Sequence, residues 1–280
     1  MSLVHFNTMV KNEEDLLQAL LPVWIDYPVD KFVFYDDNST DASVEVIKSL
    51  LPPERVEIIS NNGKEFNESR NRSEMLEFSR NQKADYVLTI DCDELLSANF
   101  LKNFNQILSI YNETNLHLFW YNVADDTIKK TRQDPSYRDN SRSFVLPMKF
   151  TNKFDLSHWK YHTPRTPTVR LPYSKTKTIG VIHLQALNRK FYACKQMWYK
   201  HYEFVNYQHP VELINARYDP VVNNLDFQTV ETPTEILGNI TFDEKVFDKI
   251  LAKKGYEEFI NQHYNKDLVT FGQEYFQSPK

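Results

Sequence analysis

The first hundred residues alternate between strand-like and helix-like segments, and this constrains the fold more strongly than any other feature of the chain. The strand-like runs cover residues 3–9, 31–37, 56–61 and 85–97, and the helix-like runs cover 11–27, 44–51 and 65–82. The first helix-like run carries apolar residues at helical spacing at Leu16, Leu17, Leu20, Leu21 and Trp24. Strands that alternate with helices form a mainly parallel sheet with right-handed crossovers. The sequence therefore predicts an α/β fold, with a mainly parallel sheet flanked by helices.

The pattern changes after residue 100. We expect a helix over 99–112 and a strand over 116–123, followed by a long polar stretch that contains several prolines. A buried strand over 178–185, an aromatic-rich helix over 189–208 and a last helix near 243–262 follow. The second part of the chain is therefore expected to be a mixed half with a helical C-terminal region.

The composition excludes several classes of function. The chain of 280 residues contains five glycines, at positions 63, 180, 238, 255 and 272. Because the dinucleotide-binding fingerprint and the Walker A loop both need clustered glycines, neither is present. The formal net charge is −5, with acidic and basic residues interspersed, which argues against nucleic acid as a partner.

The sequence shows no transmembrane span and no signal-peptide pattern. The two cysteines, Cys92 and Cys194, form neither a CxxC pair nor a disulfide framework. Three N-x-Ser/Thr sequons, at Asn38, Asn67 and Asn71, fall in a predicted binding region where glycosylation would interfere. We therefore expect a reducing, cytoplasmic location, with peripheral membrane contact left open.

The most informative motif is the run Asp91-Cys92-Asp93-Glu94, which directly follows an apolar strand. Carboxylates two residues apart at the end of a strand can converge on Mg²⁺ or Mn²⁺, which prefer oxygen ligands and share them with phosphate. The run therefore predicts a site for a metal and a diphosphate. The alternative is that Asp93 only caps a following helix.

A second polar motif, Asp36-Asp37-Asn38-Ser39-Thr40-Asp41, follows the second predicted strand. In an open parallel sheet, ligands bind outside the carboxyl ends of the strands. A carboxylate there can accept hydrogen bonds from a nucleobase or a ribose hydroxyl. The alternative is an ordinary polar turn with a capping residue.

Two further features lie near predicted helix starts. Lys11, Asn12 and Glu13 follow the first strand, and Arg70 lies early in the third helix. Helix N-termini and nearby cations favour phosphate, and the arginine fork can bind phosphate or a base. The alternatives are exposed charges at a helix start and a surface ion pair.

Taken in order, the segments VKNEEDLL, YDDNSTDAS, ESRNRS and DCDE resemble the successive motifs of the family 2-like GT-A glycosyltransferases. The resemblance covers about residues 3–100. The usual Gly of one motif is Asn38 here, and Asn tolerates left-handed backbone conformations. The resemblance implies a GT-A fold in one continuous domain. Residues 1–120 would form its nucleotide-sugar-binding half, and residues 121–280 its acceptor side and C-terminal helices.

The resemblance also implies a reaction. It predicts transfer of a sugar from a nucleotide-diphosphate sugar, with UDP as the expected nucleotide, to a saccharide or other hydroxyl acceptor. The reaction would be metal-assisted and inverting, in polysaccharide biosynthesis. In this scheme Glu13 and Asp37 bind uracil or ribose, and Arg70 contacts the nucleotide. The expected donor-binding residues are Lys11, Asn12, Glu13, Asp36, Asp37, Arg70, Asp91 and Cys92.

The metal, Mn²⁺ or Mg²⁺, would be held by Asp91 and Asp93. Members of the family often add a late His ligand, and His183 ends the predicted strand over 178–185. His183 is therefore a third candidate ligand. The alternative is that a lone His at the end of a strand is structural.

Inverting transfer needs a carboxylate that removes the proton of the acceptor hydroxyl. Asp155 is the chosen candidate for this catalytic base, because it lies in the polar and aromatic segment NKFDLSHWKYH. Its aromatic neighbours Trp159 and Tyr161 could stack on an acceptor sugar or simply pack in a core or loop. The other candidates are Asp125, Asp126 and Glu203.

Two alternative functions remain at this stage. The chain could be a nucleotide- or sugar-binding protein without catalysis. An Asp-based phosphatase of the haloacid-dehalogenase type also uses Asp-x-Asp, but that motif would follow the first strand, with Thr or Val where this chain has Leu95.

Overall fold

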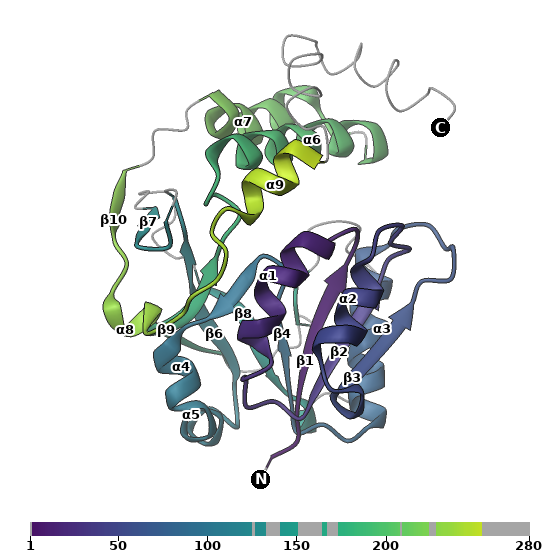
Figure 1. The fold of residues 1–280 in the computed structure, drawn as a ribbon, viewed down its shortest axis with the longest axis vertical. Coiled ribbons are helices and arrows are strands. Elements are labelled where there is room, and N and C mark those ends of the chain that lie inside the picture. The colour runs from purple at the N-terminus through teal and green to yellow at the C-terminus, as the bar shows by residue number, and fades with distance from the viewer. Residues whose placement is uncertain are drawn as a thin grey trace. The chain divides into compact units, whose positions relative to one another are not determined.

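The computed structural model describes residues 2–124, 127–132, 141–150, 164–166, 173–207, 209–223 and 228–253. The chain divides into two compact units (Figure 1). The first unit comprises Met1–Tyr121, Arg138–His183 and Thr232–Asp243, and the second comprises Asn122–Tyr137, Leu184–Glu231 and Glu244–Lys280.

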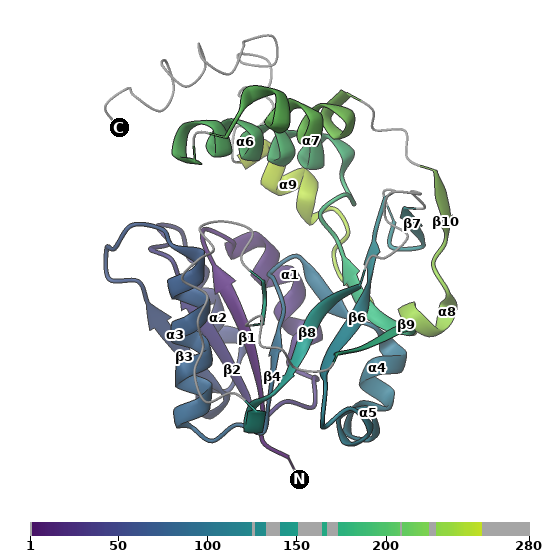
Figure 2. The ribbon, with the colours of Figure 1, turned by 180° about the vertical axis from the view of Figure 1, so that it is seen from behind.

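In the described part of the first unit, eight strands form one sheet in the order β3-β2-β1-β4-β8-β6-β9-β5. They are β1 (Val4–Val10), β2 (Lys31–Asp36), β3 (Val56–Ser60), β4 (Tyr86–Thr89), β5 (Glu94–Leu96), β6 (Asn115–Asn122), β8 (Ser141–Pro147) and β9 (Tyr173–His183). Strands β3, β2, β1 and β4 run parallel, as predicted from the alternation of strands and helices. The pairs β4–β8 and β8–β6 are antiparallel (Figure 2), and so is the pair β9–β5. The sheet is therefore mixed.

The single strand expected over 85–97 is two strands in the structure. Strand β4 ends at Thr89, and a turn closes where the Glu94 amide donates to the Asp91 carbonyl at 3.1 Å. Strand β5 then begins at Glu94 and pairs with β9. The strand is interrupted here because the motif forms a turn. The apolar residues on either side of the turn, in β4 and β5, stay buried. Asp93 therefore precedes a strand and does not cap a helix.

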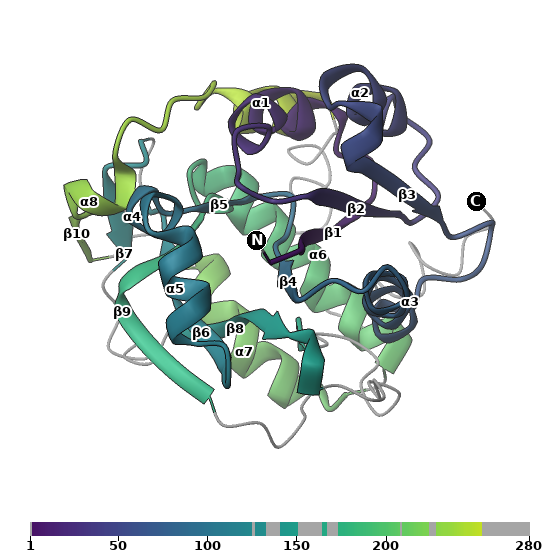
Figure 3. The ribbon, with the colours of Figure 1, turned by 90° about the horizontal axis from the view of Figure 1, so that it is seen from below.

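The helices of the parallel half lie on both faces of the sheet. Figure 3 shows α1 (Glu14–Trp24) and α2 (Ser43–Leu50) on one face of β1, β2 and β3, with α3 (Glu68–Asn81) on the opposite face; a 3₁₀ turn (Pro53–Arg55) follows α2. Helix α1 buries the same five apolar residues that the periodicity predicted. At the centre, the Phe6 ring lies 4.9 Å from that of Trp24 and 5.3 Å from that of Phe32, and all three are fully buried. Large aromatic rings that are fully buried contribute strongly to the stability of a fold.

Two short helices follow β5. The helix expected over 99–112 is α4 (Ala98–Lys102) followed by α5 (Phe104–Ile110). Asn103 separates them with φ −110° and ψ 18°, which are outside helical values, because its side chain donates to the Asn99 carbonyl and competes with the helical pattern. Helix α8 (Thr234–Leu237) belongs to the same unit and contacts α4.

Gly180 allows close approach within the antiparallel half. A Cβ atom there would lie 2.3 Å from the Phe119 carbonyl oxygen and 2.6 Å from the Tyr121 ring. Only glycine therefore fits between β9 and β6 at this point.

Asparagines provide left-handed backbone at three turns of the first unit. Asn12, Asn38 and Asn62 have φ values of 54°, 59° and 53°. Asn38 is the residue that replaces the glycine of the motif. The turn keeps its conformation because Asn tolerates the left-handed region better than other residues with a Cβ.

The second unit contains α6 (Arg189–Tyr207), α7 (Val211–Asn223), α9 (Val246–Lys253), β7 (Lys130–Arg132), β10 (Thr229–Glu231). Helix α6 matches the aromatic-rich helix expected from the sequence. Its Glu203 is 1% exposed and accepts hydrogen bonds from Arg217 at 2.8 Å and from the Tyr218 hydroxyl at 2.7 Å, both on α7. This candidate base is thus occupied in joining α6 to α7. Among the described helices of the chain, none is long and apolar enough to cross a membrane.

Candidate functional site

The parallel strands β1, β2 and β4 bring three polar segments to one edge of the first unit's sheet. Val10 of β1 pairs with Asp36 of β2, and Asn7 of β1 pairs with Thr89 of β4. Strands β1 and β2 therefore end at the same level, and β4 ends three residues earlier in the register, so that the residues after Thr89 run beside the last residues of β1. The segments that follow, 11–13, 37–43 and 90–93, are neighbours although they are far apart in the sequence.

The predicted residues Lys11, Asp36 and Asp37 meet at the loop after β2. The Lys11 ammonium donates to the carbonyl oxygens of Asp37 and Asn38. Asp36 accepts a hydrogen bond from the Ser39 amide at 3.1 Å, so its carboxylate caps the turn, as in the alternative interpretation of this motif. The Asp37 side chain points elsewhere, into the network described below.

Asn12 and Glu13 connect the loop after β1 to the loop after β2. The Thr40 amide donates to the Asn12 side-chain oxygen at 2.7 Å, and the Glu13 amide donates to the Ser43 hydroxyl at 2.8 Å. The two loops are thereby fixed to each other. This contact occupies the backbone of Glu13 and leaves the role of its carboxylate as a prediction.

Asp37 is the centre of a buried polar network and is 5% exposed. One of its carboxylate oxygens accepts from the side-chain amides of Asn61 at 2.5 Å and Asn71 at 3.3 Å. Arg70 donates to the side-chain oxygens of the same two asparagines, at 2.8 and 3.1 Å, and to the Glu65 carbonyl. Asn61 and Asn71 therefore connect Asp37 to Arg70 by hydrogen bonds. These two site residues are predicted from separate motifs of the sequence.

A different arginine of α3 reaches the acidic motif. Arg72 donates to the Glu68 carboxylate at 2.9 and 3.0 Å and to the Asp91 carboxylate at 3.4 Å. Its Nη1 atom is buried and has no hydrogen-bond partner among the described residues. This buried guanidinium N–H can therefore donate a hydrogen bond to an anionic oxygen of a ligand.

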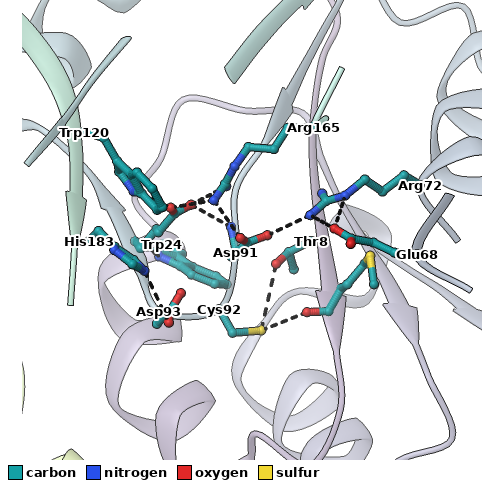
Figure 4. A network of polar contacts seen from close by, with 12 residues as sticks. Thr8, Trp24, Glu68, Arg72, Asp91, Cys92, Asp93, Trp120, Arg165 and His183 are labelled. Carbon is teal, nitrogen blue, oxygen red and sulfur yellow. Dashed lines mark hydrogen bonds and ion pairs between the residues drawn. The ribbon is translucent and has the colours of Figure 1, made fainter. Parts of the chain in front are cut away.

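Arg165 joins two carboxylates of the acidic motif (Figure 4). Its guanidinium donates to the Asp91 carboxylate at 2.6 Å and to both oxygens of Glu94, at 2.5 and 2.7 Å. Glu94 is fully buried and also accepts from the Trp120 indole N–H at 2.7 Å and from the Asp91 amide at 2.9 Å. All four hydrogen-bonding directions of this carboxylate are therefore used.

The charges in this network shift one another's pKa values. Burial raises the pKa of Asp91, but the attraction of Arg165 and Arg72 outweighs it, and the net pKa lies below its ordinary value. Burial raises the pKa of Glu94 above its ordinary value although Arg165 opposes this. Burial lowers the pKa of Arg165, and the two carboxylates more than reverse this, so the guanidinium stays charged.

Asp93 and His183 lie together on the other side of the motif (Figure 4). Glu94 pairs with His183 across strands β5 and β9, which places the His next to Asp93. The distance from Asp93 Oδ2 to His183 Nε2 is 3.6 Å, and the His ring stacks on Trp120 with centroids 4.3 Å apart. The structure thus brings two of the three predicted metal ligands together, whereas the third, Asp91, faces the arginines. In the described ranges no three His, Cys, Asp or Glu side chains form a ready metal cluster.

Cys92 points away from these carboxylates. Its thiol is buried, donates to the Met9 carbonyl at 3.2 Å and lies 3.9 Å from the Thr8 hydroxyl. Burial raises the pKa of this thiol well above its ordinary value. The Cys92 side chain therefore packs against β1 and does not join the carboxylates of the motif.

Other site residues fall outside the described residues or were not foreseen. The proposed base Asp155, the alternatives Asp125 and Asp126, and the aromatic residues Trp159 and Tyr161 lie outside the described ranges. The residues that sequence reasoning missed are Asn61, Asn71, Arg72, Glu94, Trp120 and Arg165. Three of them adjoin predicted features, since Asn61 is the last residue of the strand predicted over 56–61, Asn71 follows Arg70 and Glu94 follows Asp93. Nothing in the local sequence marks Trp120 or Arg165.

Acids, amides and arginines at the carboxyl edge of parallel strands are typical of nucleotide-binding α/β enzymes. The sequence matches the model of one family, glycosyl transferase family 2, over residues 8–176. The chain belongs to this family, so the predicted GT-A type α/β fold and the predicted glycosyltransferase class are confirmed.

Solved structures with similar folds include two of TarS from S. aureus. The 1–349 fragment is 14% identical, with a TM-score of 0.46, and the match covers 79% of this chain and 69% of that one. A longer TarS chain is 15% identical, with a TM-score of 0.49, and the match covers 77% of this chain and 42% of that one.

Glucosyl-3-phosphoglycerate synthase from Mycobacterium tuberculosis, in complex with Mn²⁺, UDP-glucose and phosphoglyceric acid, is a third similar structure. It is 14% identical, with a TM-score of 0.33, and the match covers 43% of this chain and 44% of that one. No curated protein sequence matches the chain.

Proposed function

We propose that this protein transfers a sugar from a nucleotide-diphosphate sugar, with UDP as the nucleotide, to a hydroxyl group of a saccharide acceptor, assisted by a divalent cation. The observation that carries the proposal is the meeting of the segments after β1, β2 and β4 at one edge of the first unit's sheet, where Arg70 and Asn71 of α3 join them through side-chain hydrogen bonds. Membership of glycosyl transferase family 2 supports the reaction class. A cytoplasmic location and a role in polysaccharide biosynthesis remain predictions from the sequence.

The network around Asp37 is the proposed site for the nucleoside. Asn61 and Asn71 donate to the Asp37 carboxylate and hold it in place. A carboxylate held in this way can accept a hydrogen bond from a base N–H or a ribose hydroxyl. Arg70 holds the two asparagines in position and adds a positive charge.

The diphosphate is proposed to bind between Arg72 and the acidic motif. The buried Nη1 atom of Arg72, which has no partner in the part of the chain that the structure describes, supplies a donor for a phosphate oxygen. Arg72 and Arg165 both contact Asp91 and offset part of its charge, so it repels the diphosphate less strongly than a lone carboxylate would.

Asp93 and His183 fit a divalent cation. Asp93 Oδ2 and His183 Nε2 lie 3.6 Å apart, so a carboxylate oxygen and an imidazole nitrogen are available close together. Asp93 and His183 would hold the cation. When bound, the cation would supply positive charge that stabilises the departing diphosphate.

Asp155 is proposed as the general base that takes the proton from the acceptor hydroxyl as this oxygen attacks the anomeric carbon. Attack opposite the leaving diphosphate inverts the configuration of that carbon. The support is from the sequence alone, because Asp155 lies in the polar and aromatic segment expected on the acceptor side.

The test is calorimetric titration of UDP with and without Mn²⁺, together with an assay for release of UDP from UDP-sugars. Tighter UDP binding with Mn²⁺ and release of UDP from at least one UDP-sugar are expected. UDP binding without any turnover of a panel of UDP-sugars, with and without saccharides, would favour the binding-protein alternative. Equal UDP affinity with and without Mn²⁺ would contradict the metal-assisted donor site.

A further inference from the structure

A continuous chain of contacting side chains connects Arg165 to His183. Arg165 donates to Glu94, Glu94 accepts from the Trp120 indole N–H, and the Trp120 ring stacks on His183 (Figure 4). The four residues come from β5, β6, β9 and the described segment 164–166 of the first unit. Each link is a direct contact, so a change at one end can reach the other.

The strand register alone does not fix the His183 ring. Residues directly opposite in an antiparallel pair point to the same face of the sheet, so Glu94 and His183 share a face. The direction of the ring nitrogen still depends on the side-chain torsions of His183. The Trp120 ring, 4.3 Å away and tilted by 26°, restricts the plane of the imidazole.

Trp120 is in turn fixed by a fully buried acceptor. Its N–H points at Glu94 Oε1 at 2.7 Å. Glu94 cannot rotate without losing its two bonds to Arg165 and its bond to the Asp91 amide. A buried carboxylate that loses its cation is strongly disfavoured, so these bonds hold the conformation of Glu94.

Arg165 also fixes the opposite end of the site. It donates to Asp91 and lies over the rings of Phe144 and Trp120, at 4.7 and 5.7 Å from their centroids. Its side chain is 10% exposed. One guanidinium therefore contacts the Asp91 carboxylate directly and reaches His183 through Glu94 and Trp120.

We propose that Arg165, Glu94 and Trp120 are positioning residues that hold Asp91 and His183 in the orientation needed for donor and cation. The use of this orientation for binding donor and cation rests on the proposed function. The positioning of Asp91 and His183 does not depend on it and can be measured in the protein without ligands. The three residues act through Asp91 and His183, and none of them is assigned a contact with the sugar donor.

The experiment compares Arg165→Gln, Arg165→Lys and Trp120→Phe with wild type in the full chain. Arg165→Gln removes the positive charge and the forked guanidinium group, whereas Arg165→Lys keeps the charge but removes the guanidinium group. Trp120→Phe keeps an aromatic ring but removes the N–H donor. Arg80→Gln is the matched control, because it removes an arginine from an ion pair with Glu77 on α3, outside this chain of contacts.

The first measurement is NMR of the protein without metal or nucleotide. The ring signals of His183 are assigned with His183→Gln, and the indole N–H signal of Trp120 with Trp120→Phe. In Arg165→Gln both the His183 and the Trp120 signals are expected to move. Arg165→Lys should move them less, and Arg80→Gln should leave them unchanged. A general loss of stability would not single out these two signals.

The second measurement is Mn²⁺ titration of the same proteins. Loss of a residue that orients a metal ligand typically weakens binding on the order of 10- to 100-fold, and this is expected for Arg165→Gln. Trp120→Phe should show a smaller loss, and Arg80→Gln none. If Arg165→Gln does not fold, Arg165→Lys and Trp120→Phe decide the question.

Unchanged His183 ring signals in the folded Arg165 variants would overturn the proposal. Unchanged His183 ring signals in Trp120→Phe would also overturn it. If wild type bound neither Mn²⁺ nor UDP, the proposed function would fail, while the NMR comparison would still decide whether Arg165 and Trp120 position His183. The two failures are therefore distinguishable.

Discussion

The imidazole Nε2 of His183 lies 3.6 Å from the Oδ2 of Asp93, although the two residues belong to distant parts of the sequence. The pairing of β5 with β9 produces this contact, because it places His183 opposite Glu94. Both side chains are buried at the edge of the site. The contact is the structural basis for the first two predictions.

Asp93→Ala should remove the effect of Mn²⁺ on UDP binding and leave the fold intact. The side chain provides the proposed oxygen ligand, and the turn at 91–94 is closed by a backbone hydrogen bond that the substitution keeps. UDP affinity measured by calorimetry with and without Mn²⁺ should become equal in the variant. A variant that keeps the Mn²⁺ enhancement of wild type would contradict the ligand role of Asp93.

His183→Ala should weaken Mn²⁺ binding on the order of 10- to 100-fold. The imidazole is the proposed nitrogen ligand, and its loss leaves Asp93 as the remaining side-chain ligand of this pair. Mn²⁺ titration and thermal unfolding should be measured on the same samples. A purely structural His183 would give the reverse pattern, a lower melting temperature with unchanged Mn²⁺ affinity.

Asp37→Ala should weaken UDP binding even without metal, because the carboxylate belongs to the proposed nucleoside site. Asp36→Ala is the matched neighbour, since its carboxylate caps a turn through the Ser39 amide. Loss of such a cap is expected to cost about 1 kcal/mol of stability and to affect UDP affinity less. Calorimetry in the absence of divalent cations checks both variants. Equal losses of affinity in the two would remove the specific role of Asp37.

The stability of the protein should fall on acidification because of His5. Burial, with a smaller contribution from Lys31, lowers the pKa of His5 to about 4, and its Nδ1 lies 3.1 Å from the Ser79 hydroxyl. An unfolded His titrates near 6.5, so between pH 6.5 and 4 the unfolded chain binds more protons than the folded one.

The free energy of unfolding should therefore decrease as the pH falls through this window, by at most about 1.4 kcal/mol per pH unit from this group. Urea unfolding at several pH values measures the slope in wild type and in His5→Gln. The slope should be smaller in His5→Gln, and identical slopes would show that His5 does not cause it.

Gly180→Ala should destabilise the first unit. The added Cβ would meet a backbone carbonyl at 2.3 Å, which cannot move aside like a flexible side chain. Overpacking of this kind costs about 1–3 kcal/mol. Urea unfolding is the measurement, and a variant as stable as wild type would show that β6 and β9 can separate without cost.

The sequence by itself determined the parallel half of the sheet and predicted the edge of that sheet at which the candidate site lies. The helical spacing of α1 predicted its buried face, and the polar residues after β1, β2 and β4 predicted the edge where a ligand would bind. These signals are local, because periodicity and strand ends depend on residues close together in the chain.

Only the tertiary structure decided which side chains meet. Arg70 and Arg72 are two residues apart on α3, yet the first joins Asp37 through asparagines and the second joins Asp91. Because β4 and β5 are separate strands, Glu94 lies in the edge strand β5, opposite His183 of β9, and not in the interior strand β4. Arg165 and Trp120 lie in the site because the order of the strands brings distant segments of the chain together there. Such contacts follow from long-range packing, which no local pattern of residues encodes.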